Sequence, residues 1–388
     1  MMRFLFTNLF WAPNILNDDE WAFVQTEIGR DFPWLLTEKY EVYLSGIGQD
    51  WNGWSKREQI LSHAGFKSTP FNFLNAVLAW LTHLHDALCL ANKGPIVVLA
   101  PTPESGLGAT LAKVLAGNRI RLVVRVQGHA ASRALYVKRS KWRFTVMENI
   151  EHLVMRRGDL VIPMGRFTYD LAISQGARPE KTIILPFPVR WANYPQVTDL
   201  PENPVVLFVG RLEREKGIHL LLQAMTLVRK RAPDVRLLIA GDGSYRSTLE
   251  ELTDSLGIRG NVFFLGWLQA DDLQSAYRNS WLVVLPSLVE EGLGMVLVES
   301  GLMGRPVIAS DIGGIRDIVR HGENGFLVPP GDPMALADAI VTVLKDRHLA
   351  SRMGIAGSRL AHDYLEGRKE ALERVRQAIY GLLGNEAR

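Results

Sequence analysis

Short apolar runs recur along almost the whole 388-residue chain, and segments with helical length and periodicity separate them. Runs this short and this apolar are typical of strands buried on both faces, and strands that alternate with helices build parallel sheets through right-handed crossovers. We therefore predict an α/β protein. The expected strands are residues 4–7, 96–100, 121–126, 160–163 and 182–185, followed by 205–209, 236–240, 262–265, 282–285 and 306–309.

The chain is long enough for two domains, since an ordinary domain has about 100–200 residues. A proline-rich stretch at 186–195, followed by Pro201 and Pro204, interrupts the alternation and suits neither a helix nor a central strand. We predict two Rossmann-like parallel-sheet domains that face a central cleft. Their bounds are residues 1–190, a linker at 191–204, a second domain at 205–364, and a C-terminal helix at 365–388 that packs back on the first domain.

Cysteine content and hydropathy exclude several classes of protein. Cys89 is the only cysteine, which excludes an intrachain disulfide and a cysteine metal site and suits a reducing, cytoplasmic compartment. Because it lies in an apolar run, we expect it in the core. Residues 1–14 lack a small-residue cleavage site and predict a first strand, not a signal peptide. The apolar stretch 71–90 contains two histidines and an aspartate, which argues against a membrane span.

Positive charge gathers between residues 113 and 157, where eleven lysines and arginines face only Glu148 and Glu151. A mixture of cations and aromatic rings on a helix suits anionic lipid headgroups or an anionic substrate, and a solvated helix face is the alternative. Nucleic acid is a weaker interpretation, because the net charge is only +3 and no binding signature accompanies the patch. The predicted acceptor or membrane surface consists of Arg133, Lys138, Arg139, Lys141, Trp142 and Arg143.

The first chemical motif, GRLEREKG at residues 210–217, follows the expected strand 205–209 and precedes a helix. Gly210 permits a sharp turn at the carboxyl end of the strand, where open parallel sheets bind ligands. Arg211 can donate two hydrogen bonds to phosphate oxygens, and Lys216 adds a compact charge. The motif predicts a diphosphate clamp, and a turn with solvated charges is the alternative.

The second motif, EEGLGMVLVE at residues 290–299, follows the strand 282–285. Free amides at the start of a helix over 293–296 would point towards an anion. Glu291 and Glu299 do not suit phosphate, but carboxylates accept hydrogen bonds from sugar hydroxyls. If both lay on one helix they would be about 12 Å apart and would bind different parts of one ligand. For Glu299 alone, an ordinary ion pair is the alternative.

The third motif, SDIGGIRD at residues 310–317, follows the strand 306–309 and leads to the glycine-rich turn 321–325. Its glycines predict a tight turn that lines the same cleft. Catalytic side chains are not expected there.

These blocks, together with AGDG at 240–243, VFFLGWL at 262–268 and the rest of residues 304–332, stand in a fixed order over residues 200–340. In this order they resemble glycosyltransferase family 4, the glycosyl transferases group 1, which are retaining enzymes with the two-domain GT-B architecture. The resemblance implies a nucleotide-sugar donor, with its base near 262–268, and neither a metal nor another cofactor. It assigns the diphosphate to Arg211, Lys216, Gly210, Gly294, Met295 and Val296, the ribose to Glu299, and the transferred sugar to Leu293 and a catalytic Glu291.

The first half departs from the family pattern. A glycine-rich turn usually follows the first strand, but residues 8–14 contain no glycine, so that donor contact is absent or remodelled. The counterpart of the family's catalytic histidine is His129, which could hydrogen-bond the donor sugar and stabilise positive charge at the anomeric carbon. Arg133 is a further candidate for the phosphate or the acceptor.

The expected function is metal-independent, retaining transfer of a hexosyl unit from a UDP- or GDP-sugar to a glycan, a lipid-linked acceptor or a small molecule, as in polysaccharide biosynthesis. The expected place is the cytoplasm, including the inner membrane face. A phosphorylase with a pyridoxal-phosphate lysine and a sugar-nucleotide epimerase are alternatives on the same architecture. A non-catalytic subunit that binds nucleotide sugar is a third.

Overall fold

The computed structural model describes residues 3–7, 41–48, 53–57, 60–67, 72–128, 141–189 and 199–383. The chain forms two compact units. Of the described residues, the first unit contains those up to Pro188 and from Arg368 onward, and the second contains those from Val189 to Gly367. Helix α13 (Arg347–Leu383) therefore contributes to both units. Most of the predicted linker 191–204 lies outside the described residues.

The first unit contains a seven-stranded sheet in the order β3-β4-β2-β1-β5-β6-β7. Neighbouring strands are parallel except for the edge pair β3 and β4, which is antiparallel. The sequence did not predict β2, β3 and β4. The strands are β1 (Arg3–Thr7), β2 (Glu41–Gly48), β3 (Gly53–Arg57), β4 (Ile60–Lys67), β5 (Ile96–Ala100), β6 (Ile120–Val126) and β7 (Leu160–Pro163).

The strand predicted at residues 182–185 is wrong. Only one bridge forms, between Thr182 and Val161, although the Ile183 and Leu185 amides also donate to the Val161 and Pro163 carbonyls at 3.0 and 2.8 Å. Pro186 follows directly and has no N–H group, so the pairing with β7 ends at Leu185.

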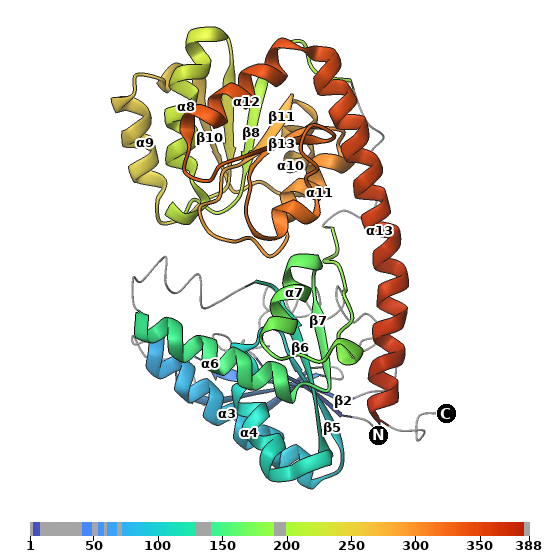
Figure 1. The fold of residues 1–388 in the computed structure, drawn as a ribbon. Helices are drawn as coiled ribbons and strands as arrows, with labels where there is room; N and C mark the ends of the chain where they lie inside the picture. The colour runs from blue at the N-terminus through green and yellow to red at the C-terminus, as the bar shows by residue number, and fades with distance from the viewer. Residues whose placement is uncertain are drawn as a thin grey trace. The chain divides into compact units, whose positions relative to one another are not determined.

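Helices cover both faces of the first sheet (Figure 1). Packing is tight where α3 crosses α4, because a Cβ on Gly108 would lie 2.2 Å from the Trp80 carbonyl oxygen. One core lies between α3, α4, α6 and the sheet, and the other packs Ala371, Val375 and Ile379 of α13 against Phe4 and its neighbours. The helices are α3 (Asn72–Asn92), η1 (Glu104–Gly106), α4 (Leu107–Ala116), η2 (Gly117–Arg119), α6 (Lys141–Arg157), α7 (Arg166–Ser174) and η3 (Pro179–Lys181).

The expectation that Cys89 lies in the core is wrong, because its side chain is exposed. It lies four residues after His85, on the same face of α3, and its Sγ is 3.4 Å from His85 Nε2. The neighbouring His83 and Asp86 are buried instead. Within the described residues, no helix has the length and hydropathy needed to cross a membrane.

The second unit contains a six-stranded sheet in the order β10-β9-β8-β11-β12-β13, and all its neighbouring strands are parallel. The chain leaves β8 for β9 on one side and later returns to β11 on the other. The strand order therefore reverses between β8 and β11, and such a topological switch point is where open parallel sheets bind ligands. The strands are β8 (Val205–Val209), β9 (Arg236–Ala240), β10 (Val262–Gly266), β11 (Leu282–Leu285), β12 (Val307–Ser310) and β13 (Gly325–Val328).

Two cores fill the two faces of this sheet. One is formed with α8, α9 and α12, and the other with α10 and α11 (Figure 1). Each core contains strand residues with almost no exposure, as expected for parallel strands covered on both sides. The helices are η4 (Arg214–Lys216), α8 (Ile218–Arg231), α9 (Arg246–Ser255), η5 (Arg259–Asn261), α10 (Ala270–Arg278), α11 (Met295–Leu302), η6 (Gly313–Asp317) and α12 (Pro333–Lys345).

Candidate active site

The first two motifs are held together through their backbones. Gly217 has a φ of +70°, and a Cβ there would lie 1.9 Å from the Pro286 carbonyl oxygen, so only glycine fits. The Leu288 amide donates to the Glu215 carbonyl at 2.8 Å. The turn after β8 and the turn after β11 therefore form one framework.

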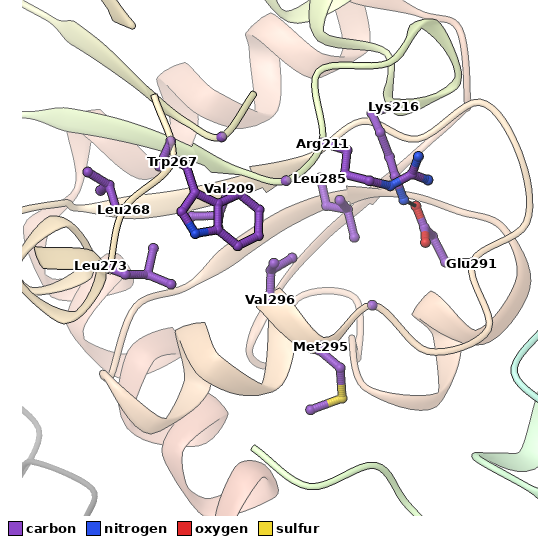
Figure 2. Close-up of a pocket in the computed structure, with 14 residues that line it drawn as sticks. Val209, Arg211, Lys216, Trp267, Leu268, Leu273, Leu285, Glu291, Met295 and Val296 are labelled. Carbon is purple, nitrogen blue, oxygen red and sulfur yellow. Dashed lines mark hydrogen bonds and ion pairs between the residues drawn. The ribbon is translucent and has the colours of Figure 1, made fainter. Parts of the chain in front are cut away.

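A cavity of about 360 Å³ opens at the carboxyl ends of β8, β9 and β11, at the switch point of the sheet. Seven of the predicted donor residues line it, namely Gly210, Arg211, Lys216, Glu291, Gly294, Met295 and Val296. Figure 2 shows the side chains around this cavity. The lining residues that the sequence did not single out are Val209, Ala240, Gly241, Trp267, Leu268, Leu273 and Leu285.

One end of the cavity is charged. Lys216 Nζ lies 2.6 Å from Glu291 Oε1, and the Ser287 hydroxyl donates to the same oxygen at 2.5 Å. Both ionic side chains are largely buried, at 17% and 15% exposure. Arg211 is more open, and its guanidinium lies 3.7 Å from the buried Glu215 carboxylate. An arriving anion would meet two cations that already lie side by side with acids.

The other end of the cavity is apolar and aromatic. The Trp267 side chain is 63% exposed, and Figure 2 shows its indole on the side of the cavity away from Arg211, Lys216 and Glu291. The sequence pointed to this turn as the location of the base, but it did not single out Trp267. A ligand with a flat apolar group and an anionic group matches this polarity.

Helix α11 begins later than the sequence predicted. Gly294 is its N-cap, with a φ of +82°, and Met295 is its first residue. The first amides of a helix have no intrahelical acceptor, so those of Met295 and Val296 are available at the cavity wall. Glu291 precedes α11, so the estimate of about 12 Å between Glu291 and Glu299, which assumed one continuous helix, does not hold. Leu293 is buried.

Glu299 lies within α11 and is only 2% exposed. The hydroxyl of the fully buried Tyr277, from α10, donates to Glu299 Oε2 at 2.9 Å. Glu299 is not among the residues that line the cavity, whereas Glu291 is. Sequence reasoning missed both Tyr277 and Ser287, the hydroxyl donors to the two glutamates.

The third motif supports the second. The Gly314 amide donates to the Glu291 carbonyl at 2.8 Å, and a Cβ on Gly314 would lie 2.1 Å from the Gly292 carbonyl oxygen. These glycines therefore let η6 approach the backbone that carries Glu291. Their contribution is to shape and hold the turn.

His219, three residues after Lys216, lies at the start of α8 with its ring edge-on to Tyr245. Its Nδ1 is buried and has no hydrogen-bond partner among the described residues. Burial, assisted by the positive charge of Arg214, lowers the pKa of His219 below its ordinary value of 6.5. The ring is therefore neutral at pH 7, and the charge of this region comes from the arginine and lysine side chains.

Several predicted residues of the first half lie outside the described residues, namely the turn 8–14, His129, Arg133, Lys138 and Arg139. Lys141 and Trp142 are exposed at the start of α6. Arg143 belongs to the same helix, and only its backbone is described. Within the described ranges, no cluster of three or more histidine, cysteine, aspartate or glutamate side chains is arranged to hold a metal ion.

Two parallel-sheet Rossmann-like units, with a polar cavity at the switch point of the second, define a protein of the GT-B class. The chain matches the glycosyl transferases group 1 family over residues 191–359 and the glycosyl transferase 4-like domain over residues 55–188. It belongs to the group 1 glycosyltransferases of the family 4 type.

Alpha-D-kanosaminyltransferase from Streptomyces kanamyceticus is 38% identical over 154 residues, which is 40% of each chain. The aligned part thus spans well under half the length of this relative. Sucrose-phosphate synthase from Thermosynechococcus elongatus has a similar structure, with a TM-score of 0.74 at 20% identity over 99% of both chains. Anabaena HepE, solved with UDP-glucose, has a TM-score of 0.70 at 22% identity over 97% of this chain and 100% of its own. At these identities the two structures support the fold alone.

Proposed function

We propose that this protein is a retaining hexosyltransferase that uses a nucleotide-diphosphate sugar. The observation that carries the proposal is the polarity of the cavity at the switch point of the second sheet. Arg211, Lys216 and Glu291 line one end, and the Trp267 indole lines the other. A nucleoside diphosphate sugar has the same sequence of groups, since an aromatic base is joined through ribose to two phosphates and a polyhydroxylated ring.

In this proposal the diphosphate binds between Arg211, Lys216 and the first amides of α11, and the base lies against Trp267. Glu291 accepts hydrogen bonds from hydroxyls of the transferred sugar. Glu299, held by Tyr277, addresses the ribose. UDP is the first candidate nucleotide, and GDP is the second.

The proposed reaction breaks the bond between the anomeric carbon and the phosphate oxygen and forms a bond from that carbon to an acceptor hydroxyl oxygen. The acceptor attacks from the face that the phosphate leaves, which retains the configuration. The hydroxyl proton passes to an oxygen of the departing nucleoside diphosphate. Arg211 and Lys216 stabilise the negative charge that develops on this leaving group, which is the main electrostatic task. Under this proposal no metal ion or cofactor is needed.

The acceptor is assigned to the first unit, where His129 and Arg133 are the proposed contacts. Its class is a glycan, a lipid-linked sugar or a small molecule. The proposed place of action is the cytoplasm, with peripheral contact to the inner membrane face.

The donor site is tested by measuring turnover and nucleotide binding in variants of its residues and in a matched control. Lys216→Ala and Glu299→Ala should each abolish turnover and weaken nucleotide binding, because one removes a phosphate contact and the other a ribose contact. Lys230→Ala, which removes an exposed lysine near the other end of α8, is the control and should match the wild type. Normal activity in both Lys216→Ala and Glu299→Ala would refute the assignment.

A donor screen separates the proposed transferase from its alternatives. UDP-, GDP- and ADP-sugars are tested by thermal shift, since a ligand that binds only the folded state raises the melting temperature. Release of nucleotide that depends on an acceptor supports transfer. Isomerisation of the free donor would indicate an epimerase, phosphate-dependent cleavage a phosphorylase, and binding without any turnover a non-catalytic subunit.

A further inference from the structure

The outward side of α4 is apolar. Seven of the twelve large exposed hydrophobic side chains in the described part of the chain lie on α3, α4 and α6. On α4 they are Leu111, Val114 and Leu115, with 41%, 55% and 71% exposure. Their spacing of three and four residues puts them on one side of the helix. An apolar group of this size at the surface of a protein marks an interaction site more often than a solitary leucine does.

Helix α6 carries a second exposed stripe. Trp142, Val146 and Leu153 are exposed, and their spacings of four and seven residues place them on one face. Arg156 and Arg157 are exposed at the C-terminal end of the helix. An aromatic ring, aliphatic side chains and flanking arginines thus follow one another along the outer surface of α6.

The three helices are neighbours. Gly108 of α4 contacts the Trp80 backbone of α3, and Lys113 of α4 donates from Nζ to the Arg157 carbonyl of α6 at 2.8 Å. Figure 1 shows α3, α4 and α6 in the same region of the first unit. The exposed apolar side chains of α4 and α6 therefore belong to adjacent helices of one layer, which we call the α4–α6 face.

The charges on this face are mainly positive. Lys141 is exposed at the N-terminal end of α6, and Arg119 is exposed just after α4. Of the two acids on α6, Glu151 is buried and Glu148 is partly exposed. A surface that combines short apolar stripes with basic flanks and tryptophan is suited to the boundary of an anionic bilayer, where the apolar groups enter the acyl region and the cations meet headgroups.

We infer that the α4–α6 face binds the surface of an anionic lipid bilayer. This inference rests on the proposed function in one respect, namely that the acceptor is carried by a membrane. The α4–α6 face is then the surface that brings the enzyme to that acceptor. A second copy of the chain is a poorer occupant, because a twofold contact through this face would bring the same cations together. A soluble polyanion would match the cations but not Leu111, Val114 and Leu115.

Flotation with vesicles tests the inference. Wild-type protein should float with vesicles of phosphatidylglycerol and phosphatidylcholine and bind more weakly to phosphatidylcholine alone. The variant Leu111→Ser/Val114→Ser/Leu115→Ser should lower the vesicle partition coefficient by about tenfold or more, because three apolar side chains no longer enter the bilayer. The matched control Met334→Ser/Ile355→Ser removes exposed apolar side chains of the second unit and should float like the wild type.

The folding of each variant is checked by its melting temperature, and Val146→Ser/Leu153→Ser on α6 serves as an independent second variant. Wild type that does not float with the anionic vesicles would overturn the inference. So would full flotation of both serine variants, or a wild-type dimer that Leu111→Ser/Val114→Ser/Leu115→Ser converts to a monomer. The UDP thermal shift of the same samples reports on the donor site separately, so failure of the membrane surface and failure of the proposed function give different results.

Discussion

The hydrogen bond from Tyr277 to Glu299 gives a sharp prediction for Tyr277→Phe. The change removes one oxygen from a fully buried ring and leaves the Glu299 carboxylate, only 2% exposed, without the donor that now lies 2.9 Å from Oε2. A hydrogen bond to a charged group contributes about 1.5–3 kcal/mol, so we expect unfolding of the second unit to become easier by about 2 kcal/mol. For a unit of about 180 residues this lowers the melting temperature by about 4–8 °C.

If Tyr277 acts by holding Glu299 against the ribose, the variant has a second effect that general destabilisation does not produce. The wild type should bind UDP more tightly than it binds the analogue without ribose hydroxyls, and Tyr277→Phe should reduce this difference in affinity. Both affinities are measured by calorimetric titration at a temperature where both proteins are folded. Tyr245→Phe is the control, because it removes the hydroxyl of a partly buried tyrosine in the same unit. An unchanged preference for ribose in Tyr277→Phe would refute the positioning role.

Three further changes test other parts of the account. Trp267→Ala should weaken UDP binding by about 1–3 kcal/mol in titration, the range for base stacking on aromatic rings, whereas Trp267→Phe should retain most of the affinity. The pKa of His219 is lower in the folded protein than in the unfolded chain, so its contribution to stability is present above pH 6.5 and is lost as the pH falls below that value. Between pH 7.5 and 5.5, the melting temperature of His219→Phe should therefore fall by less than that of the wild type. Arg305 is almost fully buried, which lowers its pKa to about 10, and its guanidinium donates to the Tyr277 and Arg278 carbonyls. Arg305→Met leaves both carbonyls without this donor and should lower the free energy of unfolding, measured in urea, by about 3 kcal/mol. A variant as stable as the wild type would contradict the reasoning.

The sequence predicted most strands of the second unit because each is a short run of apolar residues. The expected run 205–209 coincides with β8, and 282–285 coincides with β11. Strands β2 to β4 were missed because their residues include glycine, serine, lysine and arginine, which interrupt any apolar run. Of these strands β3 is at the edge of the sheet, where side chains do not need to be apolar on both faces, so composition is a weaker signal there.

The candidate site was predictable where it depends on residues close in sequence. Gly210, Arg211 and Lys216 form one motif, and the turn after a parallel strand is where such residues meet a ligand. The contacts from Tyr277 and Ser287 were not predictable, since nothing in their spacing indicates which hydroxyl meets which carboxylate. The exposure of Cys89 was missed because an apolar run does not reveal which side of a helix faces the core.

A crystal structure of the protein with UDP tests the central claim most directly, namely that the cavity at the switch point binds the donor. The account predicts diphosphate oxygens within about 3 Å of the Arg211 guanidinium and Lys216 Nζ, with the uracil against Trp267. UDP bound away from this cavity, or in it with its phosphates at Trp267 and its base at Lys216, would contradict the account.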